Sequence, residues 1–598
     1  MRNYGFSYLE NSNTNMNKLE KQGNPGGVKP RKPLRLWPGI VLLACMLLVK
    51  YLLSELITSS VAMMYKVFGS FLVGLGIFIW WAFFSRAPGI ERWLAFVLVI
   101  AAMAGTTFLL DESIATSYMG MMYLFYSFPV ICLVFVLWAI ATGNLTNRIR
   151  RVTMVIVIFL SAGFWIFLRT DGMTGDGKHD LNWRWASSHE DRLLERSAHE
   201  SGTNTVAPGP ATGVEWPGFR GVDRDGTIHG LKIATDWTAS PPVVLWRRPV
   251  GPGCSSCAIR GNLLYTQEQR GEYETVSCYD LFTGEPVWQH RDSIRFYDSH
   301  AGAGPRSTPT LAGNSVYTLG ATGVLNALDN RDGSLKWSRN AASDAGVTVL
   351  TWGFTSSPLV ADNRVIVALS GKLAAYDTTG GNLVWLGPDG GASYSSPHLL
   401  TVAGVAQVLL MSAAGAVSVD PGSGSILWEY KWPVDSRILQ PAIVGNDDLL
   451  LSCEMQGIRR VSLSKGEGGT KITDKWTSPY AVFFNDHVIH KEFVYGYDGG
   501  NLICFDLRDG GLRWKQSRYR GFILLLADQD ILLILHEKGD LTLVSATPEQ
   551  FTELARIPAI TGKTWNHPAL AGNILVVRNA QEMAAFRLPR VESAGFNP

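Results

Sequence analysis

The chain repeats one three-point pattern, in which an Asp is followed four residues later by a Gly and, four residues further on, by a Trp. Five complete copies occur: Asp280/Gly284/Trp288, Asp329/Gly333/Trp337, Asp377/Gly381/Trp385, Asp420/Gly424/Trp428 and Asp506/Gly510/Trp514. Successive tryptophans are 49, 48, 43 and 86 residues apart, so the last interval holds two repeats, with a degenerate copy near Trp476. A nearly fixed period of this length indicates an array of similar supersecondary units.

One unit, residues 356–385, shows what each repeat contains. Its short apolar or alternating runs, at 357–361, 364–369, 372–377 and 382–385, are separated by Gly, Asn and Asp turns. Such runs predict antiparallel strands, and four strands in about 45 residues predict one blade of a β-propeller. The Asp and Gly fit the turn between the third and fourth strands, because Asp bonds nearby backbone and Gly accepts positive φ. The Trp on the outermost strand can then bury its ring against the next blade.

The expected first strands set the number of blades. They start near Cys254, Ser307, Ser356, Ser396, Pro441, Phe483, Phe522 and His567. This gives eight four-stranded antiparallel blades, with seven as the alternative because two repeats are degenerate. The last unit is one strand short, and residues 243–248 are expected to complete it, which would leave only short, protected sheet edges. The propeller is assigned to residues 214–590, with a tail at 591–598.

The chain is strongly apolar before the propeller. Residues 1–33 form a basic polar arm, and residues 34–169 follow as an apolar domain. Five stretches in that domain are predicted as transmembrane helices: 36–53, 67–84, 93–110, 118–141 and 152–168. Each is about long enough to cross a hydrocarbon core of ~30 Å.

Loop charges set the predicted orientation. Arginines lie between the second and third stretches and between the fourth and fifth, whereas the alternate loops carry acidic residues. The positive-inside bias places the N-terminus in the cytoplasm and the propeller outside, which is the periplasm if the bacterium has two membranes. The anchor is then the inner membrane, and residues 170–213 are a linker with a short helix. The net charge of +2 gives no reason to expect nucleic acid.

The repeat resembles the pyrroloquinoline-quinone (PQQ) repeat, as in Tyr-Asp-Leu-Phe-Thr-Gly-Glu-Pro-Val-Trp at 279–288. Residues 215–226, Glu-Trp-Pro-Gly-Phe-Arg-Gly-Val-Asp-Arg-Asp-Gly, resemble the lead-in of many bacterial PQQ-like propellers. The resemblance covers residues 216–589. It implies that the repeat tryptophans, with Trp246 among them, dock each blade onto its neighbour. It specifies fold more than chemistry, since the same propeller serves quinoprotein alcohol and sugar dehydrogenases and a cofactor-free lipoprotein that assists outer-membrane barrel assembly.

The resemblance also implies what a dehydrogenase of this family would need. It would hold PQQ over a calcium ion with carboxylate ligands, and several members carry a disulfide between adjacent cysteines. Cys254 and Cys257 are instead separated by two residues and lack a following His for haem attachment. A local disulfide, two buried thiols and a redox pair remain alternatives for them. The two carboxylates within 221–226 lack a distal Glu in register, which favours a structural role, so no metal and no cofactor are expected.

Candidate channel-lining residues come from the loops that precede the first strands. Residues 291–306 and 340–355 precede blades two and three and should line one end of the central channel. With the equivalent place in blade eight, they supply Asp298, His300, Arg306, Trp352, Trp565 and His567. Arg306 can hold an anion, and a His near a carboxylate can act as a base. The alternative is that these are ordinary polar residues of a wet tunnel.

These observations predict a membrane-anchored, periplasm-facing propeller that acts as a non-catalytic binding or scaffold module with a protein or envelope partner. The alternative is a PQQ-dependent dehydrogenase that oxidises alcohols or sugars and passes electrons to membrane quinone. Five spans before a PQQ-type propeller resemble membrane-bound glucose dehydrogenase in this respect. A third reading is a sensor or transport accessory whose function lies in the spans.

Overall fold

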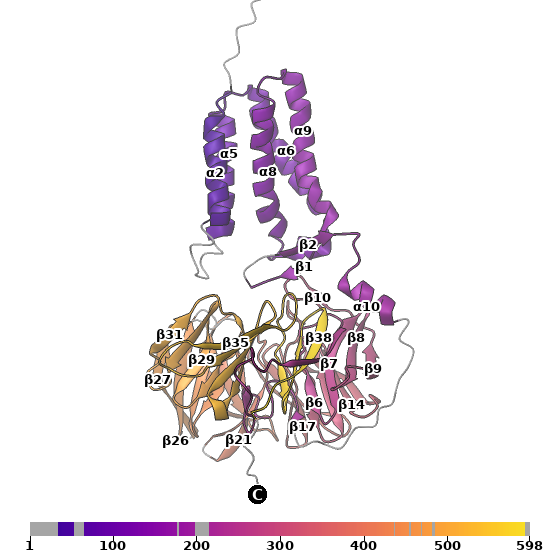
Figure 1. Ribbon diagram of the computed structural model, residues 1–598, viewed down its shortest axis with the longest axis vertical. Coiled ribbons are helices and arrows are strands. Elements are labelled where there is room, and N and C mark those ends of the chain that lie inside the picture. Colours follow the sequence, from indigo (N-terminus) through magenta and orange to yellow (C-terminus); the bar gives the residue numbers. More distant parts are fainter. Residues whose placement is uncertain are drawn as a thin grey trace, which may run out of the picture.

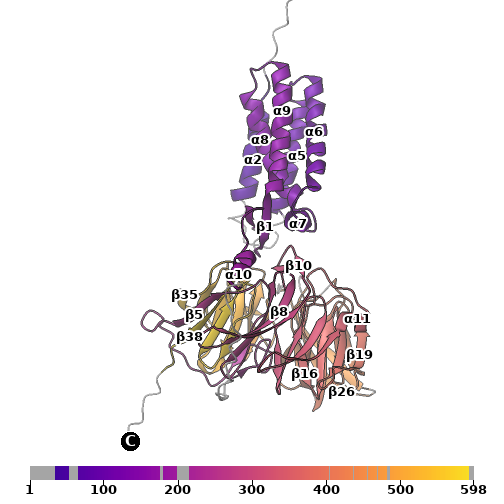
Figure 2. The same cartoon turned by 90° about the vertical axis from the view of Figure 1, so that its right-hand side faces the viewer.

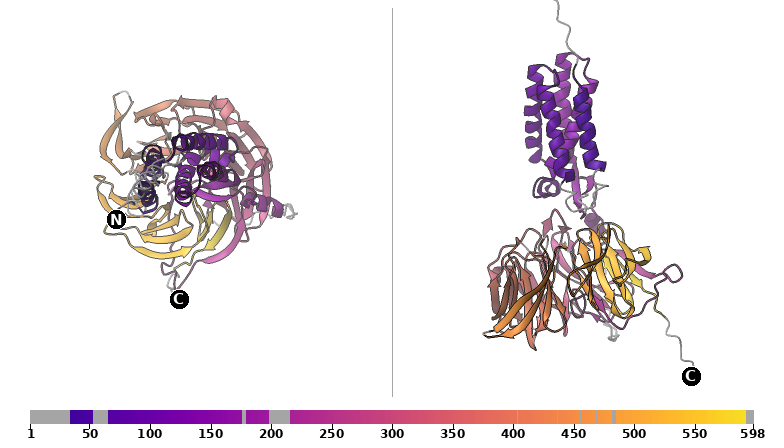
Figure 3. Two further views of the ribbon diagram at one scale, coloured as in Figure 1. Left: turned by 90° about the horizontal axis from the view of Figure 1, so that it is seen from above. Right: turned by 90° about the vertical axis from the view of Figure 1, so that its left-hand side faces the viewer.

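The computed structural model describes the chain as a helical bundle and a ring of β-sheets (Figure 1). The described residues are 34–52, 65–175, 179–197, 215–402, 404–435, 437–453, 456–467, 469–480 and 485–591. The basic arm at 1–33, the end of the linker at 198–214 and the tail at 592–598 lie outside them. Seen from above in Figure 3, the blades form a ring beneath the bundle.

The bundle consists of apolar helices whose outer faces are exposed. Its elements are α2 (Trp37–Leu47), η1 (Leu48–Leu52), η2 (Tyr65–Gly69), α5 (Ser70–Phe83), α6 (Gly89–Thr107), α7 (Glu112–Thr116), α8 (Met122–Ala141), α9 (Asn147–Gly163) and η3 (Phe164–Phe167). Trp81, Phe135 and Trp138 pack together inside, with ring centroids 5.0–5.7 Å apart. Outward-facing Ile100 and Leu160 remain 67% and 68% exposed. Large apolar side chains therefore lie on the outer faces of the bundle as well as inside it.

The prediction of five transmembrane helices is wrong in number. Within the described residues, three helices are long and apolar enough to cross a membrane: Gly89–Thr107, Met122–Ala141 and Asn147–Phe167. The other two, Trp37–Leu52 and Val67–Phe83, are shorter. At about 1.5 Å per residue they reach roughly 24–26 Å, which is less than a ~30 Å hydrocarbon core. Composition revealed the apolar stretches but not where each helix begins or ends.

Eight sheets make the ring, each with four antiparallel blade strands. Blades one to four are β6 (Ala258–Arg260), β7 (Leu263–Arg270), β8 (Tyr273–Asp280), β9 (Pro286–Asp292); β12 (Thr310–Ala312), β13 (Ser315–Leu319), β14 (Val324–Asp329), β15 (Leu335–Asn340); β16 (Leu359–Ala361), β17 (Arg364–Leu369), β18 (Lys372–Asp377), β19 (Leu383–Asp389); and β20 (His398–Val402), β21 (Val405–Ser412), β22 (Gly415–Val419), β23 (Ile426–Lys431). Blades five to eight are β24 (Ala442–Val444), β25 (Asp448–Cys453), β26 (Gly457–Gly466), β27 (Gly469–Ser478); β28 (Val488–His490), β29 (Phe493–Asp498), β30 (Asn501–Asp506), β31 (Leu512–Gln516); β32 (Gly521–Leu526), β33 (Ile531–His536), β34 (Asp540–Ser545), β35 (Glu553–Pro558); and β36 (Ala569–Ala571), β37 (Ile574–Arg578), β38 (Glu582–Arg587), β5 (Val243–Pro249). The eight-bladed reading is therefore right, and the seven-bladed alternative is not.

The segment before the first blade contributes strands to three different blades. β3 (Glu215–Trp216) pairs with β6 in blade one, and β4 (Thr227–Ile228) pairs in parallel with β32 in blade seven. β5, which contains the residues expected to complete the last blade, pairs with β38 over six positions. Strands from the two ends of the propeller sequence thus share one sheet.

The repeat residues meet at the seams between blades. The tryptophans of blades eight, one, two, three and five lie across the glycines of the next blade: Trp246 on Gly284, Trp288 on Gly333, Trp337 on Gly381, Trp385 on Gly424 and Trp476 on Gly510. A methyl group on any of these glycines would lie 2.4–2.8 Å from the indole ring. Each glycine also has φ between 67° and 74°, in the left-handed region. Only glycine meets both requirements, which explains its place in the repeat.

Polar contacts complete each seam. The indole N–H of Trp337 donates to the carbonyl of Thr378 at 3.1 Å, and the indole of Trp246 donates likewise to the Leu281 carbonyl at 2.8 Å. The repeat aspartates stay within their own turns, where Asp377 Oδ1 accepts the backbone N–H groups of Thr379 and Gly380. Donors of this kind hold the pKa of Asp377 below its usual value.

Two repeat tryptophans dock differently. Trp514 donates to the Thr547 carbonyl of blade seven at 2.8 Å, where the turn has no repeat glycine. Trp428 donates to Gln407 Oε1 of its own blade at 2.5 Å, although its ring still packs among buried residues of blade five. Blade five replaces the short Asp–Gly turn with the long β26–β27 hairpin, so the usual glycine is missing at that seam.

A second set of hydrogen bonds runs around the axis, where the first strands begin. Over five consecutive seams, a backbone N–H donates to a side chain of the next blade: Ser256 to Thr308, Thr308 to Ser357, Ser357 to Ser396, Ser396 to Gln440 and Gln440 to Asp486, at 2.9–3.3 Å. Between blades one and eight, Ser256 Oγ donates to the His567 carbonyl at 2.6 Å. The polar residues at the strand starts therefore join the blades to one another.

Candidate functional site at the propeller axis

The lead-in residues between β3 and β4 cross the axis of the ring. They start at blade one and end at blade seven. Between these points Arg224 donates to the carbonyls of Ser357 and Pro358 in blade three, at 3.0 and 2.8 Å. Arg220 donates to the His487 carbonyl of blade six at 2.7 Å. Since the contacts fall on opposite parts of the ring, this segment occupies the channel at that level.

Both arginines adopt left-handed backbone conformations, with φ of 57° each. This conformation is uncommon for a side-chain-bearing residue, and the surrounding contacts hold it in place. Arg220 is 5% exposed and Arg224 is 8% exposed. The carboxylate closest to them in the ring, Asp486, lies 3.7 Å from Arg220. Burial lowers the pKa of Arg224 to about 9, and the charge of Arg220 adds to that effect.

Three histidines surround these guanidinium groups. Burial, together with the charges of the nearby arginines, lowers the pKa of His398, His487 and His567 to about 3. His567, one of the expected channel residues, packs against Phe219 and Phe522 at centroid distances of 5.2 and 4.3 Å. A neutral imidazole between two aromatic rings fills space, and among the residues that the structure describes no carboxylate contributes to its pKa shift.

The other expected residues lie at the end of the ring that faces the bundle. β10 (Tyr297–Asp298) and β11 (Gly302–Ala303) form a small hairpin there. Arg306 forms a buried ion pair with Asp298 and lies 3.8 Å from the Cys254 sulfur. Asp298 also accepts the backbone N–H groups of His300 and Ala301. The charge of Arg306 is therefore already neutralised by a protein carboxylate.

His300 and the two tryptophans are near one another but do not form an acid–base pair. His300 Nδ1 lies 3.7 Å from Asp298 Oδ1, which is too long for a hydrogen bond. Its ring packs edge-on to Trp352 at 6.1 Å. Trp565 donates its indole N–H to Glu537 Oε1 at 2.6 Å. Burial lowers the pKa of His300, so it is neutral at neutral pH.

A hairpin from the side of the helical bundle covers these loops. β1 (Leu168–Met173) and β2 (His179–Trp183) lie between the end of α9 and the β10 loop (Figure 1, Figure 2). The Met173 N–H donates to the His300 carbonyl at 3.4 Å, and Lys563 Nζ donates to the same oxygen at 3.0 Å. The Gly175 N–H donates to Glu537 Oε1 at 2.6 Å. A methyl group on Gly175 would lie 1.6 Å from an Arg520 nitrogen, so a larger residue here would have to displace the Arg520 side chain.

The short helix expected in the linker also packs on the ring. It is α10 (His189–Ser197), and Ser188 and Asp191 cap its start through reciprocal hydrogen bonds. Glu190 pairs with Arg295 at 2.8 Å and accepts the Gly271 N–H at 2.8 Å. The helix is therefore held on the ring through Glu190.

The chemistry available at the axis is limited. Across the described ranges, no group of three or more His, Cys, Asp or Glu side chains is placed to hold a metal ion. Cys254 and Cys257 are both free thiols, and Cys257 lies 3.8 Å from the Met583 sulfur. Sequence reasoning missed Lys563, Glu537 and Gly175, although the run of glycines at 172–177 was a usable signal for a close backbone approach.

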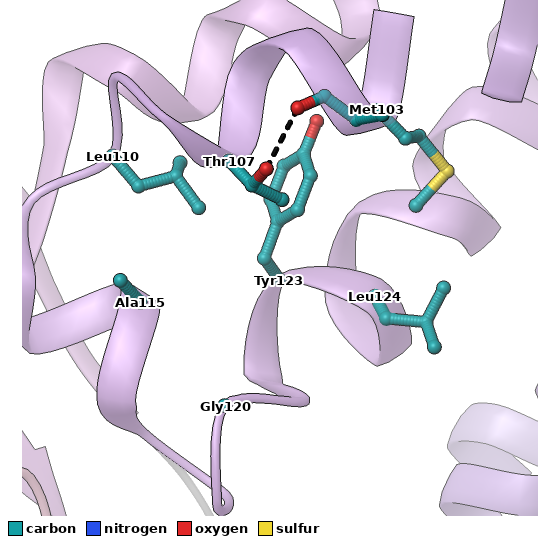
Figure 4. Close-up of a pocket in the computed structure, with 8 residues that line it drawn as sticks. Met103, Thr107, Leu110, Ala115, Gly120, Tyr123 and Leu124 are labelled. Carbon is teal, nitrogen blue, oxygen red and sulfur yellow. Dashed lines mark hydrogen bonds between the residues drawn. The ribbon is translucent and has the colours of Figure 1, made fainter. Parts of the chain in front are cut away.

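A separate pocket lies in the bundle, away from the axis. It has a volume of about 320 Å³ and is lined by α6, α7 and the start of α8 (Figure 4). Leu110, Tyr123 and Leu124 are among its lining residues, and Thr107 Oγ1 is bonded to the Ala104 carbonyl at 2.7 Å. Its lining is mostly apolar.

Comparisons with known proteins agree with the repeat. A family model described as outer membrane protein assembly factor BamB matches residues 237–388 and 272–516. The BamB proteins of Yersinia pestis and Bordetella pertussis are 26% and 23% identical to the chain, over 51% and 49% of it and 70% and 71% of their own lengths.

Among solved structures, BamB from Moraxella catarrhalis aligns with a TM-score of 0.44 and 16% identity, over 59% of this chain and 99% of that one. Quinohemoprotein alcohol dehydrogenase from Comamonas testosteroni aligns with a TM-score of 0.47 and 13% identity, over 68% and 86%. The Asp–Gly–Trp repeat, its docking geometry and the sequence matches together support a β-propeller of PQQ-type repeats that is similar in sequence to the BamB proteins.

Proposed function

We propose that this protein is a membrane-anchored scaffold whose propeller faces the cell envelope and binds protein partners without catalysing a reaction. The observation that carries this proposal is the filled axis. Arg220 and Arg224 extend into the channel from the lead-in segment and donate to carbonyls of blades six and three.

The residues at the axis do not fit PQQ and calcium. Calcium requires six to eight oxygen ligands, several of them carboxylate. Asp486 lies beside Arg220, and Asp298 is paired with Arg306. Glu537 accepts N–H groups from Gly175 and Trp565. Each of these carboxylates has partners of its own, and the guanidinium group of Arg220 beside Asp486 repels a divalent cation.

The bundle supports anchoring and the proposed orientation. The α5–α6 connection and the α8–α9 connection lie at the end of the bundle farthest from the propeller (Figure 1). Arg86 belongs to the first connection, and Arg92 and Arg148 lie in the first turns of α6 and α9. In the same turns, Glu91 and Arg150 form a buried pair at 3.1 Å. The positive-inside rule places that end in the cytoplasm. The propeller then lies outside the inner membrane, in the periplasm of a double-membrane bacterium.

The relatives support a partner protein. They are named as outer membrane protein assembly factors, and the family model of that description matches residues 237–388 and 272–516, within the propeller. We propose that the partner here is also an envelope protein. In the same proposal, β5 closes the ring, so that a rigid surface is presented at a fixed distance from the membrane.

Cofactor reconstitution tests the non-catalytic part. The full-length protein in lipid nanodiscs is mixed with PQQ and calcium and assayed for quinone absorbance and for dye reduction with alcohols and sugars, beside a quinoprotein dehydrogenase as positive control. We expect no saturable binding and no turnover. Binding with turnover would show that the filled axis opens and that the protein is a dehydrogenase. A reporter fused after Leu168 tests the orientation, and activity of that reporter in the cytoplasm would reverse it.

A further inference from the structure

The hairpin that joins the bundle to the propeller carries an exposed apolar face. Leu181 and Trp183 alternate along β2, and Trp185 continues the same alternation just beyond it. Alternate residues of a strand share one face. Their exposures are 39%, 46% and 68%. The neighbouring Asn182 is engaged within the hairpin, where it donates to Asp171 Oδ2 at 2.7 Å.

Four rings gather on this face. Trp183 and Trp185 stack with centroids 5.0 Å apart and planes inclined by 12°. Phe164 packs edge-on to Trp183 at 5.9 Å, and Phe167 packs edge-on to Trp185 at 6.1 Å. The Arg184 N–H donates to the Phe167 carbonyl at 2.9 Å and fixes the hairpin to the end of the helix. We call Phe164, Phe167, Trp183 and Trp185 the aromatic cap.

The cap is apolar surface without protein cover. Its four side chains are 45–68% exposed, whereas the docking indoles Trp246, Trp288, Trp337 and Trp385 of the blades are 5–8% exposed. Four clustered half-exposed rings form a contiguous apolar patch, which marks an interaction site when it occurs on a folded protein.

The position of the cap identifies what covers it. Phe164 and Phe167 form the last turn of the candidate span Asn147–Phe167, at the end that faces the propeller. In Figure 1 and Figure 2 the hairpin lies level with this end, between the bundle and the ring. Tryptophan is enriched at this level of membrane proteins, because its ring is apolar and its N–H remains in the hydrated headgroup region. The apolar face is thus continuous with the lipid-facing surface of α9.

We infer that the aromatic cap inserts into the interfacial region of the lipid leaflet on the propeller side, and that Trp183 and Trp185 bind lipid there. This inference rests on the proposed membrane anchoring. The opposite side of the hairpin holds the propeller through Gly175 and the His300 carbonyl. One hairpin therefore contacts lipid on one side and the ring on the other, and sets the height of the propeller above the bilayer.

Photolabelling by lipid tests this inference. The full-length protein is reconstituted in vesicles of phosphatidylethanolamine and phosphatidylglycerol that contain a trace of phosphatidylcholine with a diazirine near its headgroup. After irradiation, adducts are mapped by peptide mass spectrometry. We expect adducts on residues 179–186 and on the helices. In the Trp183→Ser/Trp185→Ser variant, hairpin labelling should fall several-fold while labelling of α6 and α8 is unchanged.

A matched control comes from the third blade. Leu383 and Leu386 on β19 are 42% and 37% exposed, but they lie on the ring and should acquire no adducts. Labelled helices with an unlabelled hairpin overturn the inference and leave the anchoring intact. Unlabelled helices with a labelled hairpin overturn the anchoring and leave lipid binding by the cap. Crosslinks between copies at 179–186, without lipid adducts, would show that a second protein molecule covers the cap.

Discussion

The seam between blades two and three allows the role of the repeat to be measured. Trp337 is 7% exposed, donates to the Thr378 carbonyl and lies across Gly381. Trp337→Ala removes the indole ring, leaves a cavity between two blades and removes the hydrogen-bond donor of the Thr378 carbonyl. Removal of a buried aromatic side chain costs about 3–5 kcal/mol.

The reciprocal change is Gly381→Ala. Its methyl group would lie 2.5 Å from the Trp337 ring, and its φ of 67° is unfavourable for any L side chain. Overpacking costs about 1–3 kcal/mol and the left-handed backbone about 1–2 kcal/mol. In the Trp337→Ala background the clash is gone and only the backbone cost remains. The two losses should therefore be strongly non-additive.

The assay is scanning calorimetry of the full-length protein in detergent, which measures the Tm of the ring. With an unfolding entropy of about 2.1 cal/mol/K per residue, a ring of about 375 residues loses about 4–6 °C in Tm for 3–5 kcal/mol. Gly313→Ala is the control, because Gly313 has a φ of 54° and nothing within 4 Å of the added methyl group. A Trp337→Ala shift no larger than that of the control, or simple additivity of the two seam variants, would refute the docking argument.

Three further predictions concern other parts of the molecule. Burial lowers the pKa of His398, His487 and His567 to about 3. The unfolded chain therefore binds more protons below about pH 6.5, and stability should fall from there toward pH 3, by up to about 1.4 kcal/mol per pH unit for each histidine. His487→Phe should make the pH dependence of Tm shallower, because it removes one of the three buried groups that take up protons on unfolding. The substitution breaks no hydrogen bond of the ring, since neither ring nitrogen of His487 has a partner among the described residues. An unchanged slope would contradict this. Gly175→Val should raise hydrogen exchange across β1 and β2 without lowering the Tm of the ring, because its side chain would displace Arg520; equal exchange in both proteins would show that the hairpin does not depend on this contact. A chain that begins at residue 251 lacks β5 and should fail to give a folded ring by circular dichroism and gel filtration, whereas one that begins at 214 should fold; a folded ring from both would show that β5 is dispensable.

The fold was predictable where the determinants are local. Within a repeat such as that of Asp377, the Asp accepts the backbone N–H groups two and three residues ahead, and the Gly follows in the same turn. A short stretch of sequence therefore suffices to predict the turn between the third and fourth strands of a blade. The helix boundaries were less predictable. Residues 118–141 form one apolar stretch, but Tyr118 and Met119 take left-handed φ of 52° and 56°, and α8 begins only at Met122.

The site was less predictable, because its contacts are long-range. Arg306 was identified as a cation near the axis, but its partner Asp298 depends on the course of the intervening loop. Arg224 bonds carbonyls 133 and 134 residues away, and nothing in its neighbourhood of sequence indicates them. Residues 221–226 looked like a defective calcium loop. Asp223 and Asp225 are exposed, and Asp225 accepts the nearby Thr227 N–H. The residue of this segment that holds blade three is Arg224.

The seam between blades seven and eight shows why the segment before the first blade is needed. Blade seven has no repeat tryptophan, and the fourth strand of blade eight arrives from the other end of the propeller sequence, so no Asp–Gly turn exists there for a ring to dock on. Ile233 takes over this position: its N–H and carbonyl bond Gln529 of blade seven at 2.6 and 2.9 Å, and its backbone pairs with Arg590 beside blade eight. Ile233 is fully buried and Trp237 is 4% exposed. The chain between β4 and β5 thus joins the pair of blades that the repeat leaves unjoined, directly after the residues between β3 and β4 that fill the axis.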